Sequence, residues 1–210
     1  MNSKQTQIDW TFGLQWLLLC AIGTAAGAGA AYVTMWTVGE AVGEASSSTL
    51  GLLTAGILFG ALIALGANLG PGWLLRSRSV NGLRWILISV VAGALGTGLT
   101  FTILSSSFDS ISGLASSLAI GLALGLPVGI GQWLILRRQS LPAGASVNAW
   151  PLISMAAYIC AGLAVVNLSG EGREWLALGI MGLSVGIITG LGMAWIMRRQ
   201  ASLAPSIPVS

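Results

Sequence analysis

The sequence predicts an all-α, polytopic membrane protein of six transmembrane helices, arranged as three helical hairpins with both termini in the cytoplasm. Three observations lead to this prediction. Only 15 of the 210 residues are charged, and the mean hydropathy is +0.86, whereas about a quarter of the residues of a soluble domain are charged. The charged residues divide the chain into six long uncharged runs, and the cations collect in alternate connections between these runs.

Each uncharged run holds the roughly 20 mostly apolar residues that a helix needs to cross the hydrocarbon core. A helix is expected there because it satisfies its own backbone hydrogen bonds where there is no water. The predicted spans cover about residues 14–36, 51–75, 84–105, 112–137, 150–168 and 175–198. They form one domain, residues 1–200, and the tail at 201–210, which contains two prolines, is predicted to be disordered.

The first span has an alternative interpretation as a cleaved signal peptide. Lys4 would supply its charged start, and Ala28-Gly29-Ala30 would supply a cleavage site of small residues. The apolar run continues past that site at spanning length, which favours a transmembrane helix.

The positions of lysine and arginine predict the orientation. Eight of the nine cations lie on one side of the predicted membrane, and Arg173 alone lies on the other. The eight are Lys4, Arg76, Arg78, Arg84, Arg137, Arg138, Arg198 and Arg199. Because cytoplasmic loops carry an excess of lysine and arginine, both termini are placed in the cytoplasm.

A glycine pattern recurs near the end of each even-numbered span. The glycine sets are Gly66, Gly70 and Gly72; Gly125, Gly129 and Gly131; and Gly186, Gly190 and Gly192. They are followed by Trp73, Arg76 and Arg78; by Trp133, Arg137 and Arg138; and by Trp195, Arg198 and Arg199. The first glycines of the sets are 59 and 61 residues apart, so a hairpin of about 60 residues is predicted to occur three times, at about 10–79, 80–139 and 145–200.

The segment from Gly125 to Arg138 resembles a known hairpin. It reads G-x-x-x-G-x-x-Q-W-x-x-L-R-R, with Gln132 and Trp133 at its centre, and it is similar to the recurring hairpin of small, uncharacterised bacterial multi-span proteins, photosynthetic bacteria among their hosts. The pattern is degraded in spans two and six. The resemblance implies a repeated helical fold in a bacterial inner membrane or an internal photosynthetic membrane, and it implies no catalytic residue.

Glycines four residues apart form a small-residue ridge on a helix, and such ridges let two helix backbones approach closely. The candidate ridge residues are Gly66, Gly70, Gly121, Gly125, Gly129, Gly182, Gly186 and Gly190. Two roles remain open for them: packing among the six helices, or docking of a partner subunit, a lipid or a pigment ring.

The tryptophans and paired arginines are typical of residues at a membrane surface. Trp16, Trp85 and Trp150, near the starts of the odd-numbered spans, and Trp73, Trp133 and Trp195, near the ends of the even-numbered spans, are expected in an aromatic belt. Stacking on a ligand is the alternative role for these rings. The arginines that follow the even-numbered spans are either topology signals or contacts to anionic lipid headgroups.

Acidic residues gather on the predicted outer side, at Glu40, Glu44, Asp109, Glu171 and Glu174. Carboxylates can hold a divalent cation, but no ligand-loop pattern accompanies them. Solvated loop positions are therefore expected, and no metal site is predicted.

The functional expectation rests on which side chains the spans contain. The chain has no histidine, and no ionisable carboxylate lies inside a span, so neither an intramembrane enzyme nor a proton-coupled transporter is expected. The preferred interpretation is a non-catalytic membrane subunit that packs with other membrane subunits or with copies of itself, binds a hydrophobic ligand such as lipid, carotenoid or quinone, or does both. The alternative is a facilitator or channel for a small neutral or lipidic solute, with Asn68, Pro71 and Pro127 as possible helix breaks. The cations do not form a nucleic-acid-binding face.

Overall fold

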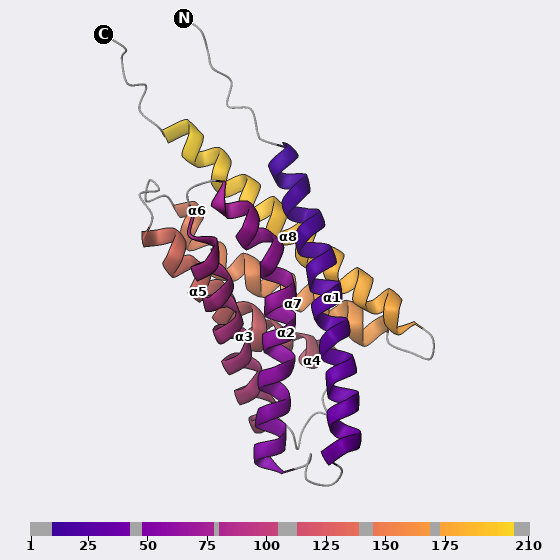
Figure 1. Cartoon of the computed structure of the whole chain (residues 1–210). Coiled ribbons are helices and arrows are strands. Elements are labelled where there is room, and N and C mark those ends of the chain that lie inside the picture. The colour runs from indigo at the N-terminus through magenta and orange to yellow at the C-terminus, as the bar shows by residue number, and fades with distance from the viewer. Residues whose placement is uncertain are drawn as a thin grey trace, which may run out of the picture.

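A computed structural model describes residues 10–42, 48–77, 80–104, 113–138, 145–168 and 173–203. Within these ranges every regular element is a helix (Figure 1). The helices are α1 (Trp10–Val42), α2 (Thr49–Arg76), α3 (Gly82–Leu104), α4 (Gly113–Ile120), the π-helix η3 (Gly121–Gly125), α5 (Leu126–Arg138), α6 (Ala145–Asn148), α7 (Trp150–Leu168) and α8 (Glu174–Leu203).

The described part of the chain contains 6 helices that are long and apolar enough to cross a membrane. They cover Trp10–Thr37, Thr49–Arg76, Gly82–Ile103, Leu114–Arg138, Trp150–Leu168 and Glu174–Ile196. The prediction of six membrane-spanning helices is therefore confirmed, and α4, η3 and α5 together form the fourth span. α8 continues through residues 201–203, at the start of the predicted tail, and residues 204–210 lie outside the described ranges. Alanine and leucine favour this extension because both are strong helix formers.

Side-chain caps fix where α2 and α3 begin. The Ser48 hydroxyl accepts a hydrogen bond from the Gly51 amide at 3.1 Å, and the Asn81 side-chain oxygen accepts one from the Arg84 amide at 3.1 Å. Each cap satisfies an amide that has no partner inside its own helix. Between the two helices, the Val80 amide donates to the Leu75 carbonyl at 3.2 Å, which ties the connection back to the end of α2.

The fourth span has an irregular middle, which the sequence anticipated only as a possible break at Pro127. In η3 the Leu126 amide donates to the Gly121 carbonyl, five residues earlier. Pro127 has no amide hydrogen and therefore leaves the Ala123 carbonyl without its usual helical donor. The α3 backbone approaches that carbonyl so closely that a Cβ added to Gly96 would overlap its oxygen.

The six spans form a closed ring in which each span packs against the spans before and after it. α1 packs on α2, α2 on α3, α3 on η3 and α5, and the fourth span on α7. α7 then packs on α8, and α8 returns to α1. The beginning of α1 and the end of α8 lie at the same end of the bundle, as expected for an even number of spans (Figure 1). The arrangement leaves a central axis that the inward-facing side chains of all six spans fill.

Candidate functional site

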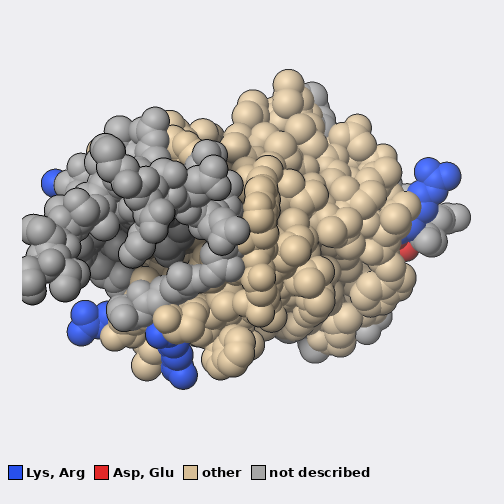
Figure 2. Space-filling view, turned by 90° about the horizontal axis from the view of Figure 1, so that it is seen from above, with Lys and Arg blue, Asp and Glu red and all other residues tan. Residues whose placement is uncertain are grey.

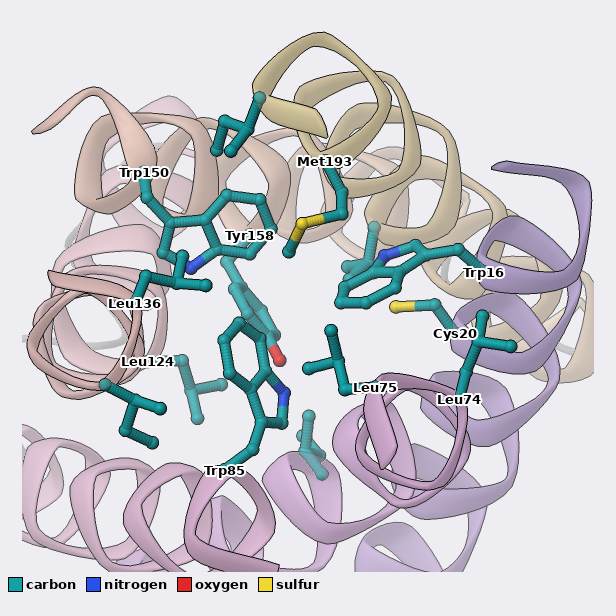
Figure 3. Packing of buried hydrophobic residues seen from close by; sticks show 14 of the residues in the cluster. Trp16, Cys20, Leu74, Leu75, Trp85, Leu124, Leu136, Trp150, Tyr158 and Met193 are labelled. Carbon is teal, nitrogen blue, oxygen red and sulfur yellow. The ribbon is translucent and has the colours of Figure 1, made fainter. Parts of the chain in front are cut away.

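Three tryptophans from the odd-numbered spans meet at the centre of the ring (Figure 3). Trp16 of α1, Trp85 of α3 and Trp150 of α7 are 2%, 0% and 1% exposed. Trp16 packs edge-on against both other rings, with centroid distances of 6.0 Å to Trp85 and 6.3 Å to Trp150. The centroids of Trp85 and Trp150 are 5.9 Å apart. These separations lie within the range of favourable aromatic pairs, and the three rings are called the central indole cluster below.

The aromatic-belt interpretation is wrong for these three residues. A belt tryptophan faces the lipid headgroups, whereas the three indoles point inward and are covered on every side. The sequence placed them near the starts of their helices but did not show which way they face. Their burial requires a polar partner for each indole N–H group, because an unpaired polar group is costly inside a bundle.

An amide-centred network supplies that partner for two of the indoles. Trp150 Nε1 donates to Gln132 Oε1 at 2.7 Å, and Trp85 Nε1 donates to Asn68 Oδ1 at 3.0 Å. The Gln132 amide nitrogen donates to Asn68 Oδ1 at 2.6 Å and to Ser89 Oγ at 2.8 Å. Gln132 therefore joins side chains of α2, α3, α5 and α7 in one buried set of hydrogen bonds.

Two further donors of this network form hydrogen bonds to backbone carbonyls of their own helices. The Asn68 amide nitrogen donates to the Ala64 carbonyl at 2.8 Å, and the Ser89 hydroxyl donates to the Trp85 carbonyl at 2.7 Å. A fully satisfied buried network favours one arrangement of the helices over others, because alternatives leave polar groups unpaired. The position of Gln132 within the Q-W motif was visible in the sequence, but its partners were not.

The third indole is satisfied on the other side of the ring. Trp16 Nε1 donates to the Thr189 hydroxyl of α8 at 3.3 Å, and that hydroxyl donates to the Val185 carbonyl at 2.6 Å. The Cys20 sulfur lies 3.6 Å from the same hydroxyl. Cys20 is buried and free of any disulfide, as expected for a small apolar residue in a span. The Trp16 group thus ties α1 to α8, where the ring closes.

A regular spacing of residues in the odd-numbered spans indicates which tryptophans face the centre of the bundle. A cysteine or serine follows each of the three tryptophans after four residues: Cys20, Ser89 and Ser154. Residues four apart lie on the same face of a helix, so the pattern places an indole and a small polar group together on each inward face. All three of these small residues are buried.

A small cavity of about 20 Å³ lies among these residues. Its lining comes from all six spans: Trp16, Cys20, Ala67, Asn68, Pro71, Trp85, Val128, Gln132, Trp150, Ser154, Tyr158, Val185 and Thr189. Pro71 cannot donate to the carbonyl of Ala67, four residues earlier, and both residues line the cavity. This volume is far too small for a quinone or a carotenoid.

The structure places the predicted glycine ridges at contacts between neighbouring spans of the same chain. Each of the eight candidates has residues of another span within 4 Å of where its Cβ would lie, and for seven of them a Cβ would clash. Gly66 and Gly70 face α1; Gly121, Gly125 and Gly129 face α7; and Gly182, Gly186 and Gly190 face α1. At Gly66 the obstacle is backbone, because a Cβ there would overlap the Gly23 carbonyl oxygen of α1. These ridges are therefore occupied by packing within the bundle.

The predicted surface anchors remain at the periphery. Trp73 and Trp195 are 67% and 41% exposed. Trp133 donates its N–H to Asn148 Oδ1 at 3.1 Å, and the Arg137 guanidinium lies 5.2 Å from its ring centroid. Arg76 and Arg138 are also exposed. Arg78 and the side chains of Arg198 and Arg199 lie outside the described residues.

The charged groups leave most of the surface apolar. In Figure 2 the described cations lie toward opposite ends of the view, and the tan surface between them shows no Lys, Arg, Asp or Glu. Of the predicted outer acids, Glu174 is half-buried and borders a surface groove of about 170 Å³ with Tyr32, Trp175 and Leu178. Glu44, Asp109, Glu171 and the side chain of Glu40 lie outside the described residues.

No protein-family model matches the chain, and neither the curated proteins nor the solved structures compared with it include a significant match.

Proposed function

We propose that this protein is a non-catalytic integral membrane subunit that associates with other membrane proteins through its outer, apolar surface. The observation that supports this proposal is the filled interior. The polar side chains of the central network hydrogen-bond to one another, and the glycine ridges pack against the chain's own helices. A partner protein or a hydrophobic ligand would therefore bind at the outer surface.

The outer surface offers long apolar rows for such contacts. On α3, side chains spaced four residues apart project outward along the whole helix: Leu83, Leu87, Val91, Leu95, Leu99 and Ile103. Each of these six is 53–72% exposed. Lipid covers such a row in a lone chain, and another helix or a flat ligand such as a carotenoid can replace lipid through close packing.

Three further proposals come from the sequence. The chain consists of three related hairpins, its termini lie in the cytoplasm, and it resides in a bacterial inner membrane or internal photosynthetic membrane. The similar placement of Trp16, Trp85 and Trp150, one in each odd-numbered span, supports the repeat. Exposed Arg76, Arg137 and Arg138 at the ends of even-numbered spans support the orientation.

Copurification from native membrane tests the subunit role. We expect the protein, extracted in a mild detergent, to elute as a particle larger than one chain with its detergent. Mass spectrometry should find partner chains in fixed proportion or a second copy of this chain, and an absorption spectrum or lipid analysis would reveal a bound pigment, quinone or lipid. A particle containing this chain alone, with no bound molecule, would contradict the proposal.

The second candidate function is a facilitator for a small neutral solute, and the central cavity favours it. The cavity is lined by residues of all six spans, and amide and hydroxyl side chains of α2, α5, α7 and α8 are among them, as expected for a constriction through which a polar molecule passes. Liposomes that contain only this chain should then show saturable, solute-specific flux. Flux without a partner, together with a particle of one chain, would replace the subunit role with that of a carrier.

Cysteine labelling tests the orientation. We expect a single cysteine at Ser46, introduced after Cys20→Ala and Cys160→Ala, to react with an impermeant thiol reagent on intact cells. A cysteine at Ser79 should react only after the cells are opened, because the positive-inside rule places that connection in the cytoplasm. The opposite labelling pattern, or equal labelling of both positions, would refute the orientation.

A further inference from the structure

Two hydroxyl groups of α7 line the central cavity and lack a hydrogen bond to the rest of the described bundle. Ser154 and Tyr158 lie one turn apart on α7, are each 2% exposed, and both line the cavity. In Figure 3 the hydroxyl end of Tyr158 is directed inward beside Trp85. Neither hydroxyl hydrogen-bonds to another residue of the described ranges, whereas the neighbouring Asn68, Ser89 and Gln132 side chains all have partners.

We propose that the cavity binds one ordered water molecule, held by the hydroxyls of Ser154 and Tyr158. A buried hydroxyl without a hydrogen bond is costly, and a buried water typically makes two to four hydrogen bonds to such groups. The cavity volume of about 20 Å³ fits one water, since about 10–15 Å³ is the minimum for one. The Ala67 carbonyl, which Pro71 leaves without its helical donor, offers the water an additional acceptor.

The chemistry of the lining favours a neutral molecule over a cation. No carboxylate lines the cavity, and a buried ion without a counter-charge carries a large desolvation cost. The best oxygen acceptor nearby, Asn68 Oδ1, already accepts hydrogen bonds from Trp85 and Gln132. Water, which both donates and accepts, matches a pair of hydroxyl groups better than sodium or ammonium does.

The bound water would connect the two separate hydrogen-bonded groups of the centre. The amide network around Gln132 and the Trp16–Thr189 pair both border the cavity, but within the described residues no hydrogen bond joins them. A water between them makes the polar centre continuous around the ring. Its contribution to stability then depends on the two α7 hydroxyls that hold it.

The effect of removing the Tyr158 hydroxyl on the melting temperature depends on whether the hydroxyl binds a water. We expect Tyr158→Phe to lower the detergent melting temperature by roughly 2–4 °C, because the water loses a partner that the phenyl ring cannot replace. If the hydroxyl had no water to bind, its removal would leave the melting temperature unchanged or raise it, and this result would contradict the proposal. Tyr32→Phe is the matched control, since Tyr32 is 48% exposed and should tolerate the change.

Two further measurements identify the ligand. Ser154→Ala combined with Tyr158→Phe should lower the melting temperature by less than the sum of the two single changes, because both remove partners of the same water. Simple additivity would contradict a shared ligand.

A density map of the unaltered protein at about 2 Å resolution should contain a peak within hydrogen-bond distance of both hydroxyls. A missing peak, or a melting temperature that rises with sodium or ammonium chloride but not with choline chloride, would overturn the assignment of a neutral water.

Discussion

Gly66→Ala is expected to destabilise the bundle by about 3 kcal/mol, at the upper end of the usual cost of overpacking. The added methyl group would overlap the Gly23 carbonyl oxygen and lie 2.8 Å from the Gly27 Cα atom, so backbone rather than a movable side chain opposes it. α1 and α2 must separate to accept it, which removes the close contact that holds two helices together in lipid. We expect the detergent melting temperature to fall by roughly 6–12 °C.

Gly179→Ala is the matched control for this change. Gly179 also lies in a membrane-spanning helix, but nothing approaches within 4 Å of the position of its Cβ. Alanine should be neutral or slightly stabilising there, because glycine is a poor helix residue. Equal melting temperatures for the Gly66 variant and the unaltered protein would show that the α1–α2 contact is looser than the structure indicates.

Gln132→Leu is expected to produce the second large effect, a loss of about 2–4 kcal/mol in the free energy of unfolding. Leucine has a similar volume but removes the acceptor of Trp150 Nε1 and the donor to Asn68 and Ser89. The indole N–H of Trp150 would then be buried without a partner, which is the costly half of breaking a hydrogen bond. Thermal unfolding followed by intrinsic tryptophan fluorescence measures the loss.

Asn167→Leu is the control for Gln132→Leu, because it also replaces an amide by leucine but lies outside the central network. Asn167 is exposed, and its amide donates only to the Leu163 carbonyl of its own helix at 2.7 Å. Leucine at this lipid-facing position should leave the melting temperature unchanged or raise it. A double-mutant cycle with Trp150→Phe should give a coupling energy above about 0.5 kcal/mol for Gln132 and none for Asn167. Zero coupling for Gln132 would mean that the hydrogen bond does not contribute.

The sequence predicted the spans well because hydrophobic length is a local property. The predicted span 150–168 coincides with α7, and the other spans differ from their helices by a few residues at the ends. The π-helix at Gly121–Gly125 was not predicted. Its shifted hydrogen bond depends on how α3 and α7 pack against the fourth span, and such contacts cannot be obtained from hydropathy alone.

The direction in which a residue faces was harder to predict than its depth. Trp16 and Trp73 look alike in the sequence, since each is an aromatic residue near the end of an apolar run. Trp16 is 2% exposed and Trp73 is 67% exposed. The difference depends on which neighbours surround each helix, and the polar partner of Trp16 is far away in the chain. Only the cysteine four residues after Trp16 gave a local sign of an inward face.

The closure of the ring between α1 and α8 has a consequence for biosynthesis. The Trp16 indole donates to Thr189, a residue 173 positions later in the chain. Because a ribosome extends a chain by only about 5–20 residues per second, the first helix waits in the membrane for roughly ten seconds or more before this partner emerges. During that interval Trp16 lacks its native acceptor and half of the packing surface of α1 remains open. A nascent chain stalled before α8 should therefore be the form most exposed to quality-control proteases and most dependent on an insertion chaperone.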